Sequence, residues 1–141
     1  MTNRVSYTLD STLESVDKAE SMAVQFAAGA GFQEDEQSNI AMAVREAAVN
    51  AVLHGNAYDP AKKFFLRYES TLDALVITIT DQGSGLDMEN IPDPLAPENL
   101  MKGSGRGIFL IRAFMDEVKF RNTHPGTEIT LIKKHAKEEP Q

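Results

Sequence analysis

Hydrophobic residues recur every three or four positions in three stretches of the chain, a spacing that predicts helices. The first helix follows a capping-box pattern at residues 11–14, the second covers residues 34–54, and the third is centred on residues 108–115. Five other stretches have the character of β-strands: residues 4–9, 63–70, 75–80, 118–122 and 127–133. The order of these elements predicts an α+β sandwich with a mostly antiparallel sheet.

The second predicted helix carries polar residues close to its apolar face. At about 100° per residue, four apolar positions fall in one narrow stripe that we expect to face the core: Ile40, Val44, Ala47 and Ala51. Glu46, Asn50 and His54 are four residues apart, so they form a file beside this stripe rather than opposite it. We therefore expect their side chains to be half-buried, where an unpaired polar group is costly.

Two interpretations of this polar file are open. In a purely structural role, the three side chains satisfy one another and the nearby backbone. Alternatively, the oxygens of Glu46 and Asn50 suit a hard cation such as Mg²⁺, which takes few protein ligands when it is bound beside phosphates. Zinc is disfavoured, because His124 and His135 show no ligand spacing.

The first of two glycine-rich segments has the sequence DQGSGL and directly follows the strand at residues 75–80. Asp81, Gly83 and Gly85 fit an ordinary tight turn, since glycine adopts positive φ at little cost. They also open a long irregular stretch, residues 81–102, which holds three of the six prolines. A loop of this length inside a compact domain is usually functional.

The second glycine-rich segment, KGSGRGIFLIRAF, leads into the third helix. Gly103, Gly105 and Gly107 leave three positions without side chains, so the backbone can approach an anion, and the following helix directs free N–H groups toward it. The spacing is neither that of a Walker A loop nor that of a dinucleotide-binding fingerprint. A flexible hinge would explain the same three glycines.

Composition limits the possible functions. The 141 residues, 42% hydrophobic and 25% charged, fit one domain, which we place at residues 1–134, with a polar tail at 135–141. The absence of cysteine excludes disulfides and thiolate chemistry, and a net charge of −7 argues against general nucleic-acid binding. No apolar run has the length of a signal peptide or a bilayer span, so we expect a cytoplasmic protein with no membrane contact.

Taken in order, three segments resemble the N box and the two glycine boxes of the Bergerat-fold (GHKL) ATPases, a superfamily that includes sensor histidine kinases: EAAVNAVLHGN, DQGSGL and GSGRGIFLI. The closing GTEITL resembles the Gly-Thr that ends their nucleotide pocket. The E-x-x-x-N-x-x-x-H-G form of the N box, the short single domain and the ending GIFLIRAFMDEV resemble anti-sigma-factor serine kinases of the RsbW type. This resemblance covers nearly the whole chain. It implies a two-layer α/β sandwich in which three helices cover one face of a mostly antiparallel mixed sheet.

The resemblance also implies roles for individual residues. Asn50 would hold Mg²⁺ against the triphosphate of ATP, and Glu46, one helical turn away, would be the general base that accepts the proton of the attacking hydroxyl. Asp81 would accept a hydrogen bond from the adenine amino group, with Thr127 in support. The full set that the resemblance assigns to ATP binding is Asn50, His54, Asp81, Gly83, Gly85, Leu86, Gly103, Ser104, Gly105, Arg106, Gly107 and Thr127.

Two parts of this implied site concern the phosphates. The glycines of the second box would wrap them, and residues 86–102 would form a lid over ATP. Arg106 would either reach the γ-phosphate or face the solvent.

The implied function is that of an ATP-dependent serine/threonine protein kinase that acts as an anti-sigma factor. Its partners would be a STAS-domain anti-anti-sigma protein, which it phosphorylates, and a sigma factor, which it sequesters; by the same analogy it would be a homodimer. Two alternatives remain: a binding switch in which ATP only closes the lid, and a regulator whose partner is not a sigma factor. Glu46 favours the kinase, because a pure switch needs no general base.

Overall fold

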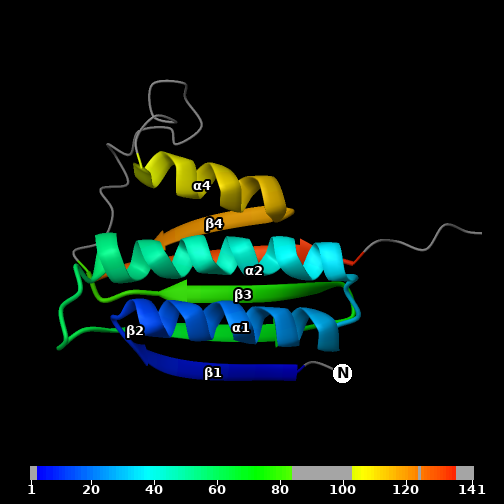
Figure 1. The fold of residues 1–141 in the computed structure, drawn as a ribbon, viewed down its shortest axis with the longest axis horizontal. Coiled ribbons are helices and arrows are strands. Elements are labelled where there is room, and N and C mark those ends of the chain that lie inside the picture. Colours follow the sequence, from blue (N-terminus) through cyan, green and yellow to red (C-terminus); the bar gives the residue numbers. More distant parts are fainter. Residues whose placement is uncertain (1–2, 84–102, 124, 136–141) are drawn as a thin grey trace, which may run out of the picture.

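We describe the fold from a computed structural model, for residues 3–83, 103–123 and 125–135. Five strands form one sheet in the order β1-β2-β3-β5-β4: β1 (Asn3–Asp10), β2 (Lys63–Ser70), β3 (Ala74–Thr80), β4 (Glu117–Asn122) and β5 (Thr127–Lys134). Three helices cover one face of this sheet (Figure 1): α1 (Leu13–Gly29), α2 (Glu34–Val49) and α4 (Gly103–Phe114). The predicted α+β sandwich is confirmed. All four pairings between the described strands are antiparallel, so this part of the sheet is not mixed.

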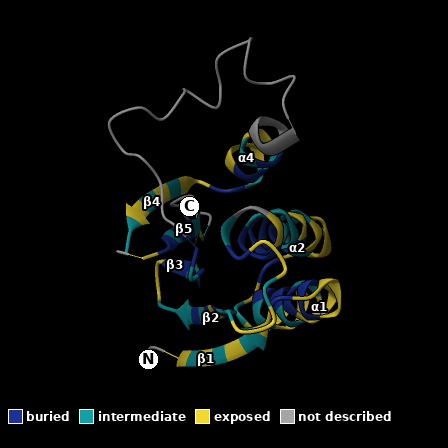
Figure 2. Ribbon diagram, turned by 90° about the vertical axis from the view of Figure 1, so that its left-hand side faces the viewer, coloured by how far each residue is buried: buried dark blue, intermediate teal, exposed yellow. Residues whose placement is uncertain are grey.

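The core lies between the helix layer and the sheet, where Figure 2 shows the buried residues of both layers facing one another. In β2 the side chains alternate, so that Phe64, Leu66 and Tyr68 are buried on the helix-facing side. The Tyr68 ring stacks on Phe26 at 4.5 Å between centroids, and its hydroxyl donates to the Ala19 carbonyl oxygen at 2.9 Å. These contacts tie α1 to β2.

Helix α2 occupies the centre of the helix layer, between α1 and α4 (Figure 1). The predicted core stripe is confirmed, since all four of its residues are buried: Ile40, Val44, Ala47 and Ala51. Alanines also line the buried side of α1, at Ala19, Ala23 and Ala27. Such small side chains let the two helices approach closely.

The second predicted helix consists of two elements. After α2 the chain continues as a π-helix, η1 (Asn50–Gly55), in which the hydrogen bonds reach one residue further. The Asn56 N–H donates to the Ala51 carbonyl oxygen at 2.8 Å in this way. Ala57 and Tyr58 then adopt positive φ values of 50° and 58°, a left-handed conformation that prevents the helix from continuing. Single π-turns of this kind are often found at functional sites.

Two helix starts also differ from the predictions. The N-cap of α1 is Thr12, which accepts the Ser15 N–H at 3.2 Å, whereas the capping-box pattern placed it at Ser11. Ser11 is buried instead, and its hydroxyl donates to the Lys62 carbonyl oxygen at 2.7 Å. Helix α4 begins at Gly103, within the second glycine-rich segment rather than after it. The first N–H groups of α4, which have no acceptor within the helix, therefore belong to that segment.

Candidate functional site

The first part of the candidate site lies where β3 ends and β5 begins. These strands are antiparallel neighbours, so Asp81 at the end of β3 lies beside Thr127 at the start of β5. The Asp81 N–H donates to the Thr127 carbonyl oxygen at 3.0 Å. The Asp81 Oδ1 accepts two backbone N–H groups in return, from Gly83 at 2.9 Å and from Thr127 at 3.2 Å. The sheet thus brings together residues 46 positions apart in the chain.

The Asp81 carboxyl group is buried, with 8% of the residue exposed. Burial raises the pKa of Asp81, and the two backbone N–H donors oppose this shift because they stabilise the ionised form. Both donors bind Oδ1, and among the described residues Oδ2 accepts no hydrogen bond. One oxygen therefore fixes the orientation of the group, and the other remains available as an acceptor.

Three positions near Asp81 require glycine, because the Cβ atom of any other residue would clash with a neighbouring segment. A Cβ atom on Gly55 would lie 2.2 Å from Asp81 Oδ2. One on Gly83 would lie 2.1 Å from the Gly55 carbonyl oxygen, and one on Gly126 would lie 2.1 Å from the Asp81 carbonyl oxygen. Gly126 also has a φ of 107°, which favours glycine in any case. The end of η1, the first glycine box and the start of β5 are therefore in direct backbone contact.

The second part of the candidate site lies between α2 and α4. Glu46 on α2 and Asn50, the first residue of η1, are both half-buried, as predicted. A Cβ atom on Gly107 of α4 would lie 3.1 Å from Glu46 Oε2 and 3.8 Å from Asn50 Oδ1. Glycine at this position keeps the α4 backbone next to both polar side chains. The structure thus brings the N box and the second glycine box together.

The π-helix η1 connects the two parts, with Asn50 at its first position and Gly55 at its last. The Asp81–Thr127 pair lies against its end, while the Glu46–Asn50 pair lies at its beginning. Glu46 and Asn50 thus offer oxygen atoms that suit a hard cation at the beginning of η1. Asp81 offers a carboxylate of fixed orientation at its end.

Several predicted site residues lie outside the described part of the structure. Gly85, Leu86 and the predicted lid at residues 86–102 are among them. The backbone at residues 103–106 forms the first turn of α4, but the side chains of Ser104 and Arg106, like that of His54, are not described.

Asn56 ends the N-box segment, but the sequence interpretation gave it no role of its own. Asn56 is fully buried and its carboxamide bonds to three other segments of the chain. In the sequence it follows a helix-ending glycine, where asparagine is a common turn residue, so no local signal separates this role from an ordinary turn.

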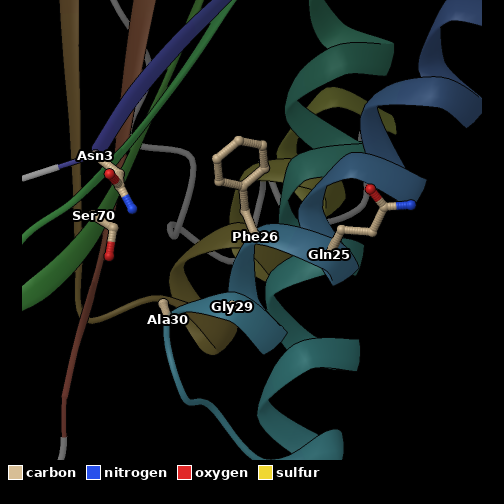
Figure 3. Close-up of a pocket in the computed structure, with 6 residues that line it drawn as sticks. All are labelled: Asn3, Gln25, Phe26, Gly29, Ala30 and Ser70. Carbon is tan, nitrogen blue, oxygen red and sulfur yellow. The ribbon is translucent and has the colours of Figure 1, made fainter.

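A pocket of about 240 Å³ lies away from this site. It lies between the end of α1, which contributes Phe26, and the paired strands β1 and β2, which contribute Asn3 and Ser70 (Figure 3). Ser70 is the last residue of β2, whereas the candidate site adjoins the first residues of that strand. No charged side chain lines the pocket, so we do not assign the nucleotide to it.

Within the described residues, no helix combines the length and the hydrophobicity that a bilayer span requires.

Comparisons with known proteins agree with the sequence motifs. Residues 9–133 match the histidine kinase-like ATPase domain family. The serine-protein kinase RsbW of Bacillus subtilis is 30% identical over 110 residues, which cover 73% of this chain and 68% of that protein. The anti-sigma F factor of Clostridium perfringens (strain SM101 / Type A) is 32% identical over 105 residues, covering 71% of this chain and 74% of that protein.

Solved structures show the same fold at lower identity. The structure of the RsbU and RsbW domains of Rv1364c from Mycobacterium tuberculosis has a TM-score of 0.63 at 18% identity. The match covers 93% of this chain but only 32% of that one. A mycobacterial sensor histidine kinase, MprB, matches with a TM-score of 0.56 at 16% identity, over 92% of this chain and 97% of that one. The family match and the named relatives confirm the predicted family and the predicted enzyme class, an ATP-dependent protein kinase. The chain belongs to the histidine kinase-like ATPase domain family, in the branch of RsbW-type serine-protein kinases and anti-sigma factors.

Proposed function

We propose that this chain is an ATP- and Mg²⁺-dependent serine/threonine protein kinase that acts as an anti-sigma factor and phosphorylates a STAS-domain anti-anti-sigma protein. The observation that carries the proposal is the position of Glu46 and Asn50 against the side-chain-free Gly107 of α4. A carboxylate and an amide are thus held where the backbone of a glycine-rich helix start approaches them. The names of the relatives, serine-protein kinase RsbW and anti-sigma F factor, support the same assignment.

Asp81 is the residue that we propose for adenine recognition. Its Oδ1 is bound by the Gly83 and Thr127 N–H groups, so the carboxylate has a fixed orientation before any ligand arrives. Its Oδ2 can accept a hydrogen bond from an exocyclic amino group, which adenine has and which guanine replaces by a carbonyl at the corresponding position. A buried acceptor facing a second acceptor costs free energy, so this arrangement favours ATP over GTP.

Glu46 and Asn50 are the residues that we propose for the phosphoryl-transfer end. Their carboxylate and carboxamide oxygens are hard donors of the kind that Mg²⁺ prefers, which fits Asn50 as its protein ligand. When bound, ATP supplies the γ-phosphoryl group and Mg²⁺ neutralises its charge. We assign to the Glu46 carboxylate the role of accepting the proton of the attacking serine or threonine hydroxyl, because it lies one helical turn before Asn50, the proposed Mg²⁺ ligand at the start of η1. The free N–H groups in the first turn of α4 are available to phosphate oxygens.

The wider assignment follows the relatives. We propose that residues 1–134 form the catalytic domain, that the protein works in the cytoplasm as a homodimer, and that a sigma factor is its second partner. A net charge of −7 is consistent with protein partners rather than nucleic acid.

Phosphotransfer from labelled ATP tests this proposal. The purified chain is incubated with Mg²⁺, labelled ATP and the STAS-domain proteins of the same genome, next to a Glu46→Gln variant. We expect label on one STAS protein with the wild type and none above background with the variant. ATP-dependent binding of a STAS protein without transfer of label would instead identify a non-catalytic switch. Absence of ATP binding by the wild type would contradict the proposal.

A further inference from the structure

We propose that Asn56 is a positioning residue for the nucleotide site, which fixes the first glycine box to the end of η1 and thereby sets the position of the Asp81 carboxylate. This inference rests on the proposed function in so far as Asp81 reads the adenine ring. Asn56 touches neither ATP nor the reacting atoms in this scheme; it acts through the loop that carries Asp81.

The Asn56 carboxamide is fully buried and makes three hydrogen bonds. Its Oδ1 accepts the Gln82 N–H at 2.8 Å. Its Nδ2 donates to the Ser11 hydroxyl at 2.9 Å and to the Lys63 carbonyl oxygen at 2.8 Å. One side chain therefore joins the turn before α1, the start of β2 and the first glycine box.

Only a carboxamide at this distance from the backbone satisfies all three partners. The Gln82 N–H requires an acceptor, whereas the Lys63 carbonyl oxygen requires a donor. The Ser11 hydroxyl uses its own proton to donate to the Lys62 carbonyl oxygen, so it too requires a donor from Asn56. Aspartate would offer only acceptors to these groups, and an aliphatic side chain would leave all of them unpaired in the interior.

The hydrogen bond between the Gln82 N–H and Asn56 holds the chain at a point between Asp81 and Gly83, the residues at the proposed adenine end of the site. Gln82 lies directly between Asp81 and Gly83, and the Gly83 N–H donates to Asp81 Oδ1. The carbonyl oxygen of Gly55, next to Asn56, lies so close to Gly83 that a Cβ atom there would be 2.1 Å away. A displacement of Gln82 away from Asn56 would therefore move the Gly83 donor and change the orientation of the carboxylate.

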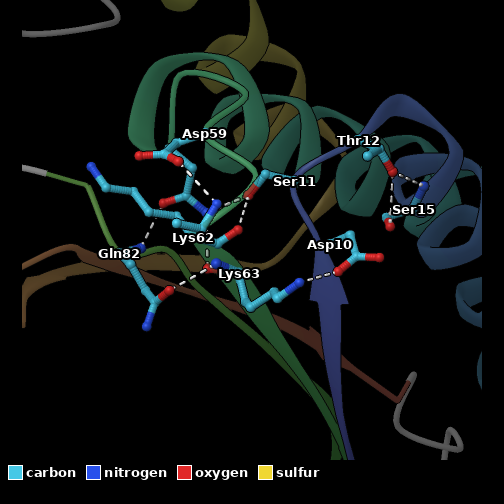
Figure 4. A network of polar contacts seen from close by, with 10 residues as sticks. Asp10, Ser11, Thr12, Ser15, Asp59, Lys62, Lys63 and Gln82 are labelled. Carbon is cyan, nitrogen blue, oxygen red and sulfur yellow. Dashed lines mark hydrogen bonds and ion pairs between the residues drawn. The ribbon is translucent and has the colours of Figure 1, made fainter.

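Further polar contacts, of Gln82 and Lys63, join this loop to the start of β2 (Figure 4). The Gln82 side chain turns back toward β2, where its Oε1 accepts the Lys63 N–H at 2.7 Å. Lys63 also forms an ion pair with Asp10 at the end of β1. The loop is thus bonded to Asn56 through the backbone of Gln82 and to β2 through the Gln82 side chain.

The test compares two variants that remove different sides of the Asn56 network. Asn56→Ala removes the bond to the Gln82 N–H, whereas Ser11→Ala removes a contact on the side away from the loop and keeps that bond. Amide hydrogen exchange of Gln82 and Gly83 is measured in the nucleotide-free protein, relative to amides in the middle of β3. Affinities for ATP and GTP are measured by calorimetry on the same samples.

We expect Asn56→Ala to accelerate exchange at Gln82 and Gly83 at least about tenfold relative to β3, the effect of losing one buried hydrogen bond. We also expect it to reduce the preference for ATP over GTP by a similar factor. Ser11→Ala should lower the melting temperature but leave both quantities as in the wild type. Unchanged exchange in Asn56→Ala, or equal acceleration in Ser11→Ala, would overturn the inference.

A second variant keeps the inference testable if Asn56→Ala does not fold. Asn56→Asp retains an acceptor for the Gln82 N–H but loses both donors, so Gln82 should stay protected while global stability falls. Loss of protection at Gln82 in this variant would contradict the positioning role. If the wild type binds no ATP, the proposed function fails, while the exchange comparison still decides whether Asn56 holds the loop.

Discussion

Asp81 and Thr127 are joined by two hydrogen bonds: the Asp81 N–H donates to the Thr127 carbonyl oxygen at 3.0 Å, and the Thr127 N–H donates to Asp81 Oδ1 at 3.2 Å. The first bond extends the pairing of β3 with β5, and the second fixes the carboxylate to the same strand. The sheet itself therefore orients the group that we propose for adenine recognition. A preorganised acceptor of this kind loses little conformational entropy when a ligand binds.

Asp81→Asn should separate stability from nucleotide binding. Asparagine can still accept both N–H groups through Oδ1, but its NH2 group then takes the place of Oδ2 and faces the adenine amino group as a second donor, so ATP affinity should fall by about 1–3 kcal/mol. Burial raises the pKa of Asp81, so the ionised carboxylate costs stability as the pH rises through that pKa. The variant should therefore be at least as stable as the wild type at pH 7. This advantage should shrink as the pH falls toward 3.8, the ordinary pKa of an aspartate, because the wild-type carboxyl group then becomes protonated. Calorimetry and thermal melts at several pH values measure both effects. A variant that melts lower at pH 7 would contradict the burial argument.

Glu46→Gln should strongly reduce phosphotransfer without loss of ATP binding. Glutamine has nearly the same shape but cannot accept the proton of the substrate hydroxyl, so transfer to a STAS-domain protein should fall about 10²-fold or more. Glu34→Gln is the matched control, because it removes the same charge from the first turn of the same helix. Equal transfer rates for the two variants would exclude Glu46 as the base.

Asn50→Ala should lose the Mg²⁺-dependent part of ATP binding. The carboxamide oxygen is the protein ligand that we propose for the ion, and alanine offers no oxygen in its place. Calorimetric titrations of ATP with Mg²⁺ and with EDTA should differ for the wild type and agree for the variant. Asn39→Ala, in α2 and 11 residues earlier, should behave as the wild type. A full Mg²⁺ effect in Asn50→Ala would assign the ion to other residues.

Two glycine-to-alanine substitutions should change stability in opposite directions. At Gly126, φ is 107° and a Cβ atom would lie 2.1 Å from the Asp81 carbonyl oxygen, so alanine should cost about 2 kcal/mol or more. At Gly29, the last residue of α1, no atom beyond the adjoining residues and backbone of the helix itself lies within 4 Å of the added Cβ. Alanine has the higher helix propensity, so Gly29→Ala should stabilise by up to about 1 kcal/mol. Thermal or denaturant unfolding of both variants measures the contrast, and a neutral Gly126→Ala would show that the β3–β5 end can move apart.

Local sequence patterns were sufficient to predict the elements and their faces. The core stripe of α2 and the half-buried positions of Glu46 and Asn50 follow from the helical period alone, because side chains at fixed spacing must share a face. The family was recognised from three short motifs, since each is a contiguous run of residues. These properties depend on neighbours within one or two turns of the same element.

Tertiary contacts decided the start of α1 and the role of Asn56. Ser11 has the sequence context of an N-cap, but it lies in the interior, where its hydroxyl is bonded to Lys62 and to Asn56, 45 residues away. Gln82 is 26 residues from Asn56, so no pattern in either segment reveals that they are joined. A buried polar group takes whichever partner the packed chain provides, because leaving it unpaired costs more than altering a cap or a helical turn. The sequence alone therefore determined which residues we propose for ATP binding, and the packing of distant segments determined how the Asp81 carboxylate is held.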